Sequence, residues 1–134
     1  MAILGIGMDL VDVERIGRIY RRHGAAFVAR ICQDGECKPY RGQALIEHLA
    51  GLFAAKEAMF KALGTGWAKG VGFRQVEVTR APSGAPGYRL HGAAAARATQ
   101  LGVVSTHLSI THERHLAAAV AVLEGEFPAS GEVG

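Results

Sequence analysis

Hydrophobic residues fall into a simple order along the first half of the chain. Residues 2–11 are almost all apolar or glycine, which is typical of a buried strand. Asp12 follows and can cap a helix over residues 13–24, where apolar side chains recur at helical spacing. A second, short helix is expected at residues 25–31, and the longest helical pattern covers residues 43–63.

The second half combines strands and turns with one alanine-rich helix. Its predicted elements are a strand at residues 73–79, a turn at 81–87, a strand at 88–92, a helix at 93–102 and a two-stranded hairpin at 106–124. This order predicts an α+β fold, with a mostly antiparallel sheet packed by helices on one face. We expect a single domain over residues 1–124 and a flexible tail over residues 125–134.

Composition supports a single domain with a substantial hydrophobic core. The chain has 134 residues, of which 49% are hydrophobic and 20% are charged. No apolar run reaches the roughly 18–20 residues that a membrane-spanning helix needs. The N-terminal apolar run has no basic region before it, so we expect no signal peptide, no membrane association and a cytoplasmic protein. Cys32 and Cys37 are interpreted as ordinary thiols, because disulfides are unusual in the cytoplasm.

Positive charge gathers in the first predicted helix, although the formal net charge of the chain is only +3. Such a cluster is often no more than a solvated helix face. It also fits a docking surface for an acidic protein. Nucleic-acid binding is less favoured, because the chain has no RNA-binding or zinc-finger motif. The residues concerned are Arg15, Arg18, Arg21 and Arg22.

The long helix carries charges among apolar residues. In FAAKEAMFKALGTG, residues 53–66, bulky side chains share one face and alanines line the other, so both faces are expected to pack. Glu57 and Lys61 are one turn apart, in the order that favours a surface ion pair of about 0.2–0.5 kcal/mol. Lys56 lies on the bulky face, where its long stem can cross apolar surface and bring the ammonium to water.

Two carboxylates are more deeply embedded in apolar sequence than the others. Asp9 ends the first strand, and Glu57 lies in the long helix. Each has an ordinary structural interpretation, but such a pair also suits Mg²⁺ that is shared with a substrate phosphate. Gly64 is expected to end the helix as a left-handed cap, and a phosphate near it would need Lys61 and Lys69 for its charge.

Three segments together resemble the holo-acyl-carrier-protein synthases, which are small single-domain phosphopantetheinyl transferases. They are GIGMDLVDVERI at residues 5–16, FAAKEAMFKALGTG at 53–66 and HLSITHERHLAAAVAVLE at 107–124. The resemblance extends over nearly the whole chain, but it is poor at residues 32–48. It implies an enzyme that moves the phosphopantetheine arm of coenzyme A to a serine of apo acyl carrier protein and releases adenosine 3′,5′-bisphosphate.

The resemblance also implies roles for particular residues. Asp9 and Glu57 would hold Mg²⁺ with the coenzyme A diphosphate, while Lys61 would contact the phosphates and protonate the leaving group. His112 would lie near the phosphates as a third catalytic residue, although a lone histidine is more often structural. The acceptor of the serine proton is left open, with Glu57 or a water beside it as the hypothesis. The coenzyme pocket would be lined by Lys61, Gly64, Thr65, Ser83, Gly84, Pro86 and His112.

Carrier docking and assembly follow from the same resemblance. Arg15 matches a basic residue that meets the acidic recognition helix of the carrier, whereas Arg18, Arg21 and Arg22 fit that role by charge only. These enzymes are typically homotrimers with active sites between subunits, so part of one face of the long helix is expected to meet a neighbour. The chain departs from the family at Leu52, where many members have an arginine that helps to hold the coenzyme.

Two other classes of function compete with this one. A non-catalytic module could bind acidic proteins through the arginine cluster, but it would have no need of Asp9, Glu57 and Lys61. An unrelated Mg²⁺-dependent hydrolase would turn over coenzyme A or nucleotides without a protein acceptor.

Overall fold

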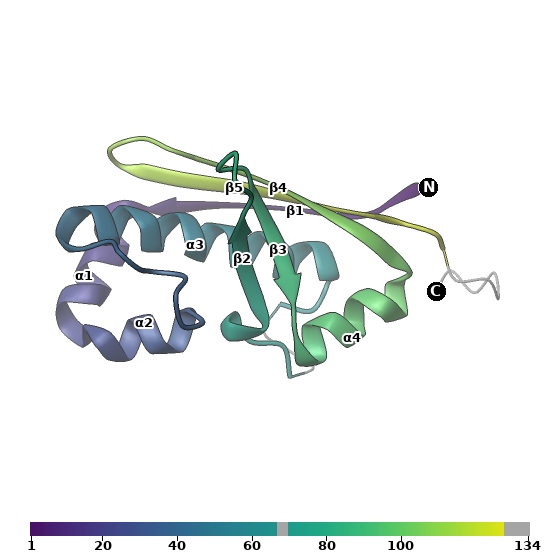
Figure 1. The fold of residues 1–134 in the computed structure, drawn as a ribbon, viewed down its shortest axis with the longest axis horizontal. Helices are drawn as coiled ribbons and strands as arrows, with labels where there is room; N and C mark the ends of the chain where they lie inside the picture. Colours follow the sequence, from purple (N-terminus) through teal and green to yellow (C-terminus); the bar gives the residue numbers. More distant parts are fainter. Residues whose placement is uncertain (67–69, 128–134) are drawn as a thin grey trace.

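A computed structural model describes residues 1–66 and 70–127, which form two antiparallel sheets and four α-helices (Figure 1). In chain order the elements are β1 (Ala2–Asp12), α1 (Val13–His23), α2 (Ala25–Ile31), α3 (Gly42–Leu63), the 3-10 helix η1 (Phe73–Gln75), β2 (Val76–Arg80), β3 (Pro86–Leu90), α4 (Gly92–Leu101), β4 (Val103–His112) and β5 (Leu116–Gly125).

Most of the local predictions are confirmed. Asp12 caps α1 by accepting a hydrogen bond from the backbone N–H of Glu14 at 3.0 Å, and Gly102 ends α4 in the left-handed conformation with φ 88°. The predicted hairpin is formed by β4 and β5, whereas β3 begins at Pro86, inside the predicted turn. β5 extends to Gly125, the first residue of the predicted flexible tail. Residues 128–134 of that tail lie outside the described part of the chain.

The predicted strand at residues 73–79 is wrong at its start, because its first three residues form η1 and β2 begins at Val76. The 3-10 turn brings the ring of Phe73 against that of Phe53, with 5.3 Å between centroids. It also lets the guanidinium of Arg74 donate to carbonyl oxygens at the end of α2. Aromatic packing and the capping of α2 therefore outweigh the strand pattern at this point.

The larger sheet has the strand order β1-β5-β4, and α3 lies along one of its faces (Figure 1). Glycines allow the close approach: a Cβ on Gly5 would overlap the backbone oxygen of Ala62, and a Cβ on Gly7 would overlap that of Ala58. The alanine face of α3 is therefore buried within the same chain. Because β1 covers this face within one chain, a neighbouring subunit would have to meet α3 at another part of its surface.

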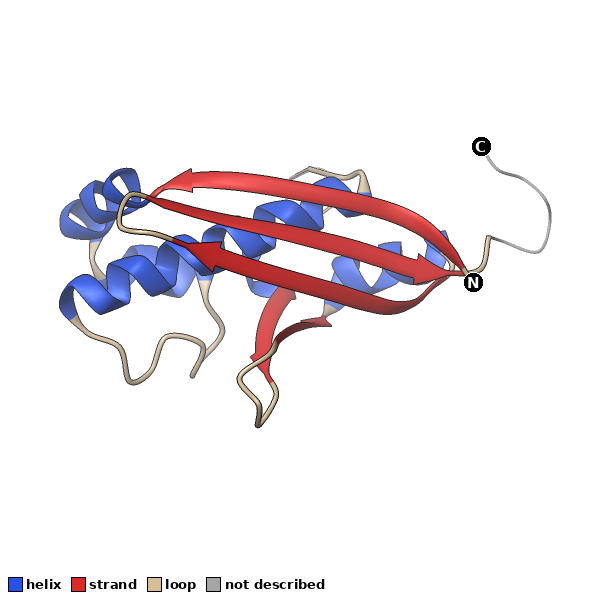
Figure 2. Ribbon diagram, turned by 90° about the horizontal axis from the view of Figure 1, so that it is seen from above, coloured by secondary structure: helices blue, strands red, loops and turns tan. Residues whose placement is uncertain are grey.

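The opposite face of this sheet is open, since none of the described helices covers it (Figure 2). The glycines of β1 face α3, so strand alternation turns Ile6, Met8 and Leu10 outward. These three side chains are 65%, 61% and 63% exposed. We call them the open apolar face; a row of large apolar side chains on a surface is a mark of an interaction site.

The smaller sheet, formed by β2 and β3, packs against the other side of α3. The hydroxyl of Tyr88 in β3 donates to the backbone carbonyl of Ala55 in α3 at 2.6 Å. Burial raises the pKa of Tyr88, so this hydroxyl keeps its proton and remains a donor. The two sheets thus hold α3 from both sides, which fixes the positions of the charged residues on this helix.

Lys56 is fully buried, so the expectation that its ammonium reaches water is wrong. The Nζ atom donates to the carbonyl oxygens of Ile31 at 2.8 Å and Phe73 at 3.1 Å. It also pairs with the carboxylate of Glu36 at 3.0 Å, and the side chain of Glu36 is only 2% exposed. A partner charge and two carbonyl groups replace the water that the ammonium loses on burial.

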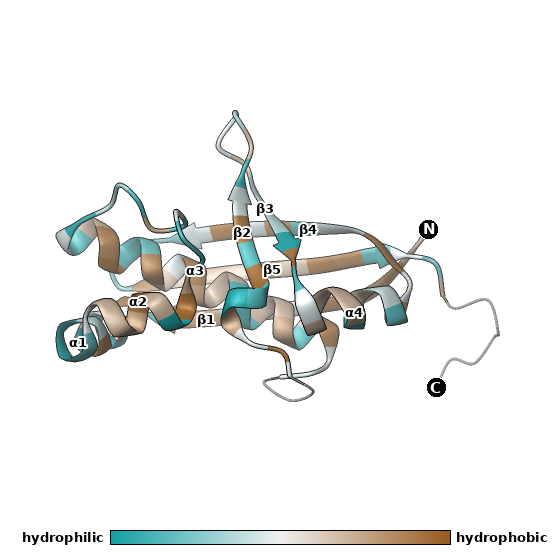
Figure 3. Cartoon of the chain, turned by 60° about the horizontal axis from the view of Figure 1, so that its bottom comes forward, coloured by the Kyte–Doolittle hydropathy of each residue, from teal (hydrophilic) through white to brown (hydrophobic). Residues whose placement is uncertain are grey.

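Helix α1 is more hydrophilic than the strand at the centre of the larger sheet. Figure 3 shows α1 coloured largely as hydrophilic and β5 coloured largely as hydrophobic. Across residues 1–66 and 70–127, no helix is both long enough and apolar enough to cross a membrane. The exposed arginines of α1 present positive charge to solvent.

Candidate active site

The carboxylate of Asp9 and the ammonium of Lys61 form an ion pair at the junction of β1 and α3. Their Oδ1 and Nζ atoms are 3.1 Å apart, and Nζ also donates to the backbone carbonyl of Met8 at 2.9 Å. The side chain of Asp9 is 16% exposed, whereas that of Lys61 is 54% exposed. The structure thus joins the first strand to the long helix through two predicted site residues, with the lysine open to a ligand.

Glu57 lies on the same stretch of α3, one helical turn before Lys61, and is half-buried. Gly7 lies against Ala58, and Asp9 is the next residue of β1 that faces α3. Two residues of β1 span about the same length as four residues of α3, as the contacts of Gly5 with Ala62 and of Gly7 with Ala58 show, so Asp9 lies beside the helical turn that precedes Ala58 and contains Glu57. Glu57 therefore lies on α3 within about one helical turn of the Asp9–Lys61 ion pair.

A metal ion at this place would need ligands from outside the protein. Among the residues that the structure describes, no group of three or more His, Cys, Asp or Glu side chains could hold a metal ion. Asp9 and Glu57 can offer carboxylate oxygens, which are ligands that Mg²⁺ prefers, and Mg²⁺ commonly completes its shell with water and substrate phosphates. The contact with the ammonium of Lys61 shows that the carboxylate of Asp9 already accepts a cation.

The end of α3 is a regular helix stop. Gly64 has φ 73° and ψ 19°, and the N–H groups of Gly64 and Thr65 bond to carbonyl oxygens of the last helical turn. The left-handed cap predicted for Gly64 is confirmed. Thr65 is 7% exposed, and its hydroxyl donates to the carbonyl of Gly66 at 3.1 Å. Lys69, the other predicted phosphate contact, lies outside the described residues.

A second group of predicted coenzyme residues lies at the other end of α3. His112 and Gly84 line a pocket of about 470 Å³, and Ser83 and Pro86 flank Gly84 in the chain. Gly84 has φ 90° in the tight turn between β2 and β3, and its carbonyl accepts a hydrogen bond from Arg80 at 3.3 Å. The other residues that line this second pocket are Tyr40, Ala44, Glu47, His48, Gly51, Arg80 and Ile110.

The second pocket contains groups that the sequence did not single out. The rings of Tyr40 and His48 are stacked, with 4.1 Å between centroids. Burial lowers the pKa of His48, so its imidazole is neutral near neutral pH, and Nε2 contacts the carbonyl oxygen of Glu36 at 2.7 Å. Arg80 supplies the permanent positive charge. A flat aromatic surface beside a cation suits a planar, phosphorylated ligand.

The predicted coenzyme residues therefore form two groups rather than one within a single chain. The second pocket reaches α3 at Gly51, whereas the helix ends at Gly64. Thirteen residues of helix separate these positions, which corresponds to about 20 Å along its axis. Leu52 is buried, 2% exposed, so its side chain lies in the core and cannot replace an arginine at the surface.

The four arginines of α1 are all exposed, whereas Ile16 on the same helix is buried. Arg15 reaches α3, with its guanidinium carbon 5.9 Å from the centroid of the Phe53 ring. Arg18 makes a loose pair with Glu14 at 3.8 Å, which contributes little because both groups are solvated.

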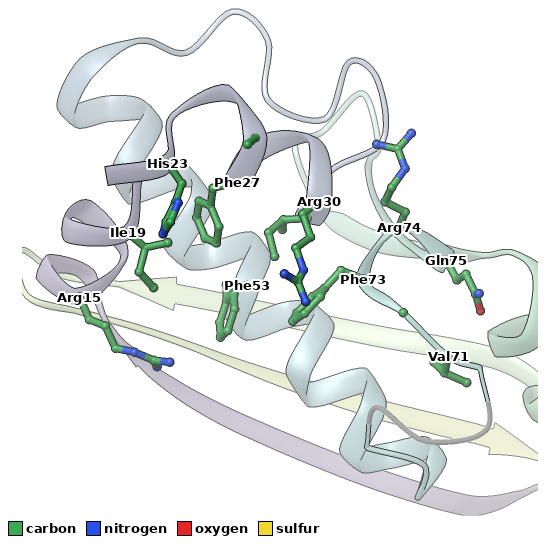
Figure 4. Close-up of a pocket in the computed structure, with 13 residues that line it drawn as sticks. Arg15, Ile19, His23, Phe27, Arg30, Phe53, Val71, Phe73, Arg74 and Gln75 are labelled. Carbon is green, nitrogen blue, oxygen red and sulfur yellow. The ribbon is translucent and has the colours of Figure 1, made fainter. Parts of the chain in front are cut away.

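A large apolar pocket lies directly beside this helix and was not anticipated from the sequence. It has a volume of about 800 Å³ and is formed by α1, α2, α3 and the segment around η1. Phe27, Phe53 and Phe73 project into it, and Arg15 and Arg30 reach it from separate helices (Figure 4). We call it the aromatic pocket.

Periodicity identifies each of these aromatic residues as apolar, but it cannot show that three separate elements bring them together. Glu36 was missed for a related reason, because it lies in a loop with no regular pattern and pairs with a lysine twenty residues away. A lysine among bulky apolar neighbours was the available signal for a buried partner.

Comparison with known proteins identifies the family to which the chain is similar. A family model described as the 4′-phosphopantetheinyl transferase superfamily matches residues 5–121. The holo-[acyl-carrier-protein] synthase of Nitratidesulfovibrio vulgaris (strain DP4) is 48% identical over 122 residues, which cover 91% of this chain and 98% of that protein.

Solved structures agree in fold. The holo-[acyl-carrier-protein] synthase of Neisseria meningitidis matches with a TM-score of 0.83 and 34% identity, over 92% of this chain and 99% of that one. A holo-(acyl-carrier-protein) synthase from Bacillus anthracis str. Ames, in complex with CoA (3′,5′-ADP), matches with a TM-score of 0.77 and 35% identity, over 92% and 98%. The chain therefore belongs to the holo-acyl-carrier-protein synthases, enzymes of the 4′-phosphopantetheinyl transferase superfamily.

Proposed function

We propose that this enzyme transfers the phosphopantetheine arm of coenzyme A to a serine hydroxyl of apo acyl carrier protein, with Mg²⁺, and releases adenosine 3′,5′-bisphosphate. The observation that carries the proposal is the contact of Lys61 with Asp9, one turn from Glu57, at the exposed junction of β1 and α3. A diphosphate needs both signs of charge at its site: cations for its oxygens, and carboxylates for the metal that accompanies it.

The protein groups at this junction have separate tasks. The ammonium of Lys61, held in place by the carbonyl of Met8 and by Asp9, contacts the phosphate oxygens and gives a proton to the leaving phosphate. Glu57 is the candidate acceptor of the proton of the attacking serine. Asp9 and Glu57 would hold Mg²⁺, which when bound neutralises charge on the diphosphate. No covalent bond between enzyme and substrate is needed.

The second pocket suits the adenosine end of coenzyme A. The stacked rings of Tyr40 and His48 offer a flat surface, and Arg80 and His112 can contact a phosphate. Ser83, Gly84 and Pro86 form the adjoining turn, where Gly84 lets the backbone approach a ligand closely. Arg80 is our candidate for the positive charge that Leu52 does not supply.

The separation of these two groups supports the proposal that the enzyme assembles, as a homotrimer, with active sites between its copies. Along the axis of α3, Lys61 and Gly64 of one chain lie about 15 Å and about 20 Å from Gly51 of its own second pocket, so a single coenzyme A would meet both groups more simply if they came from different copies. The open apolar face of β1 provides the surface for such an association. We propose that Gly64 and Thr65 of one copy and the second pocket of its neighbour bind the same coenzyme.

The acyl carrier protein is proposed to dock on α1. Its acidic recognition helix would lie along Arg15, Arg18, Arg21 and Arg22, which are exposed and positively charged. The aromatic pocket beside Arg15 can accept apolar side chains from the same helix. The positive charge of α1 would speed the association with the acidic carrier helix, and burial of apolar carrier side chains in the aromatic pocket would stabilise the complex.

The test is a transfer assay read by mass spectrometry. Purified enzyme is mixed with apo acyl carrier protein from the source organism, coenzyme A and Mg²⁺, and the carrier should gain the mass of one phosphopantetheine group. Adenosine 3′,5′-bisphosphate should appear in equal amount, and omission of Mg²⁺ with a chelator present should stop the reaction. If coenzyme A is consumed at the same rate without carrier, the protein is a hydrolase and the proposal fails.

The variant Asp9→Asn tests the site itself. It keeps the size of the side chain but removes the charge, so turnover should fall by about 10²-fold or more while the circular dichroism spectrum stays unchanged. Asp34→Asn is the matched control, because Asp34 is an exposed loop carboxylate away from the junction. Full activity in Asp9→Asn would refute the assignment of this carboxylate.

A further inference from the structure

The two thiols of the chain lie in contact. Cys32 and Cys37 are its only cysteines, both are free, and their Sγ atoms are 2.8 Å apart. They flank a turn over residues 33–36, in the loop between α2 and α3. The sequence led us to interpret both as ordinary thiols, and it did not predict that they lie in contact.

The fold holds both ends of this loop. The N–H of Cys32 donates to the carbonyl of Val28 at 2.8 Å, and the carbonyl of Cys32 accepts a hydrogen bond from Arg74. Next to Cys37, the carboxylate of Glu36 pairs with the buried ammonium of Lys56 at 3.0 Å.

The carboxylate of Glu36 has two further contacts. It accepts hydrogen bonds from the backbone N–H groups of Gln33 at 2.5 Å and Val78 at 3.0 Å. The proximity of the two sulfur atoms is therefore imposed by the native structure rather than by their short separation in the chain.

The two thiols are not equivalent. Cys32 is buried, 3% exposed, while Cys37 is half-buried. The hydrogen bond between the two thiols lowers the pKa of Cys37, and the same bond together with burial raises the pKa of Cys32. Cys37 is thus the thiol that forms a thiolate and meets solvent, and Cys32 keeps its proton beside it.

We propose that Cys32 and Cys37 form a redox-active dithiol, which a hydroperoxide oxidises to an intramolecular disulfide. The thiolate of Cys37 attacks the peroxide oxygen, the O–O bond breaks, and Cys37 becomes a sulfenic acid while hydroxide or alkoxide leaves. The thiol of Cys32 then attacks the sulfur of Cys37, the S–O bond breaks, and water leaves with the thiol proton. One peroxide is reduced by two electrons, and two thiols become one disulfide.

Only a small movement is needed for the second step. The sulfur atoms must approach from 2.8 Å to the disulfide bond length of about 2.05 Å. The dithiol also lies directly behind the aromatic pocket, because Ile31, the neighbour of Cys32, lines that pocket. Oxidation would therefore modify the protein beside the wall of the aromatic pocket.

The experiment treats the full-length reduced protein with hydrogen peroxide, traps free thiols in denaturant, and counts them by mass spectrometry. The native protein should lose both thiols together, its mass should fall by about 2 Da, and dithiothreitol should restore both thiols. Peptide mapping should place the bond between Cys32 and Cys37 of one chain. Protein unfolded in urea should form this bond at least about tenfold more slowly, because the fold no longer holds the sulfur atoms together.

Single variants separate the roles of the two thiols. In Cys37→Ser, the remaining Cys32 should react with peroxide at least about tenfold more slowly than the wild-type pair. In Cys32→Ser, the reaction should stop at a sulfenic acid on Cys37 that a 1,3-diketone reagent captures. The proposal is overturned if both thiols survive peroxide, if the disulfide links two chains only, or if Cys37→Ser reacts as fast as Cys32→Ser.

Discussion

At the scale of single residues, Lys56 shows how a charge can belong to a core. Its ammonium is fully buried and meets Glu36 together with two backbone carbonyls, one from the end of α2 and one from η1. One side chain of α3 therefore ties together three segments that are distant in sequence. Such a pair adds little net stability compared with an apolar pair, but removal of one partner alone leaves an isolated buried charge.

We therefore predict that Lys56→Met lowers the free energy of unfolding by about 3–5 kcal/mol. The cause is the carboxylate of Glu36, which stays buried without its counter-charge. Urea denaturation followed by circular dichroism measures the change, and Lys38→Met serves as control because Lys38 is exposed. The double variant Lys56→Met/Glu36→Gln should recover part of the loss, since no charge then remains unpaired. If Lys56→Met were as stable as Lys38→Met, the ion pair would have no structural role.

At the scale of elements, the packing of α3 on β1 places the catalytic candidates. Two glycines of β1 let the helix backbone approach the strand, and Asp9 follows at the next inward position. The distance between helix and strand therefore decides whether Lys61 reaches Asp9. A larger side chain at either glycine would increase that distance.

Gly7→Ala should lower the free energy of unfolding by about 1–3 kcal/mol or more, because its methyl group would overlap the backbone oxygen of Ala58, which cannot rotate away. Chemical denaturation provides the measurement, and turnover should fall as well because Lys61 is displaced from Asp9. Gly72→Ala is the matched control: nothing lies within 4 Å of the added Cβ, and its φ of −135° suits alanine. Equal stability of the two variants would mean that the close approach is not needed.

Helix α1 allows a separate prediction about the carrier. Arg15→Glu should raise the KM for apo acyl carrier protein by about tenfold or more, with little change in the KM for coenzyme A, because Arg15 lies on the proposed docking surface and away from the second pocket. Steady-state kinetics at varied salt concentration measure this change. Added salt should raise the KM for the carrier more in the wild-type enzyme than in the variant. Lys38→Glu provides the same charge change elsewhere. A change confined to coenzyme A would refute docking on α1.

Local pattern predicted most elements because each one depends on its own residues. Asp12 caps a helix and Gly64 ends one through contacts within a few residues, so both positions could be read from the sequence. η1 was missed because the position of Phe73 is decided by a ring on α3, a contact that no local pattern contains. Contacts between distant segments, rather than propensity, decide such cases.

At the scale of the whole molecule, the candidate site also contains features that the sequence could predict and features that depend on contacts between distant segments. The family resemblance selected Asp9, Glu57 and Lys61 as site residues, but the direct ion pair of Asp9 with Lys61 was not predicted. The sequence could not predict that Phe27, Phe53 and Phe73 line one pocket, because each ring comes from a different element. The division of the coenzyme residues into two groups was equally hidden, because it depends on the length and direction of α3.

That division leads to the last prediction, on assembly. Wild-type protein should sediment as a trimer, and Met8→Glu should sediment as a folded monomer, because a charge in the middle of the open apolar face must lose its hydration when the copies associate. Ala96→Glu is the control, since Ala96 is exposed on α4 and away from that face.

Analytical ultracentrifugation gives the mass, circular dichroism confirms the fold, and calorimetry measures the binding of coenzyme A. Loss of binding in the Met8→Glu monomer would show that one chain cannot bind the coenzyme alone. A wild-type monomer that retains full turnover at the assay concentration would contradict the shared site, because Lys61 and the second pocket would then act within one chain.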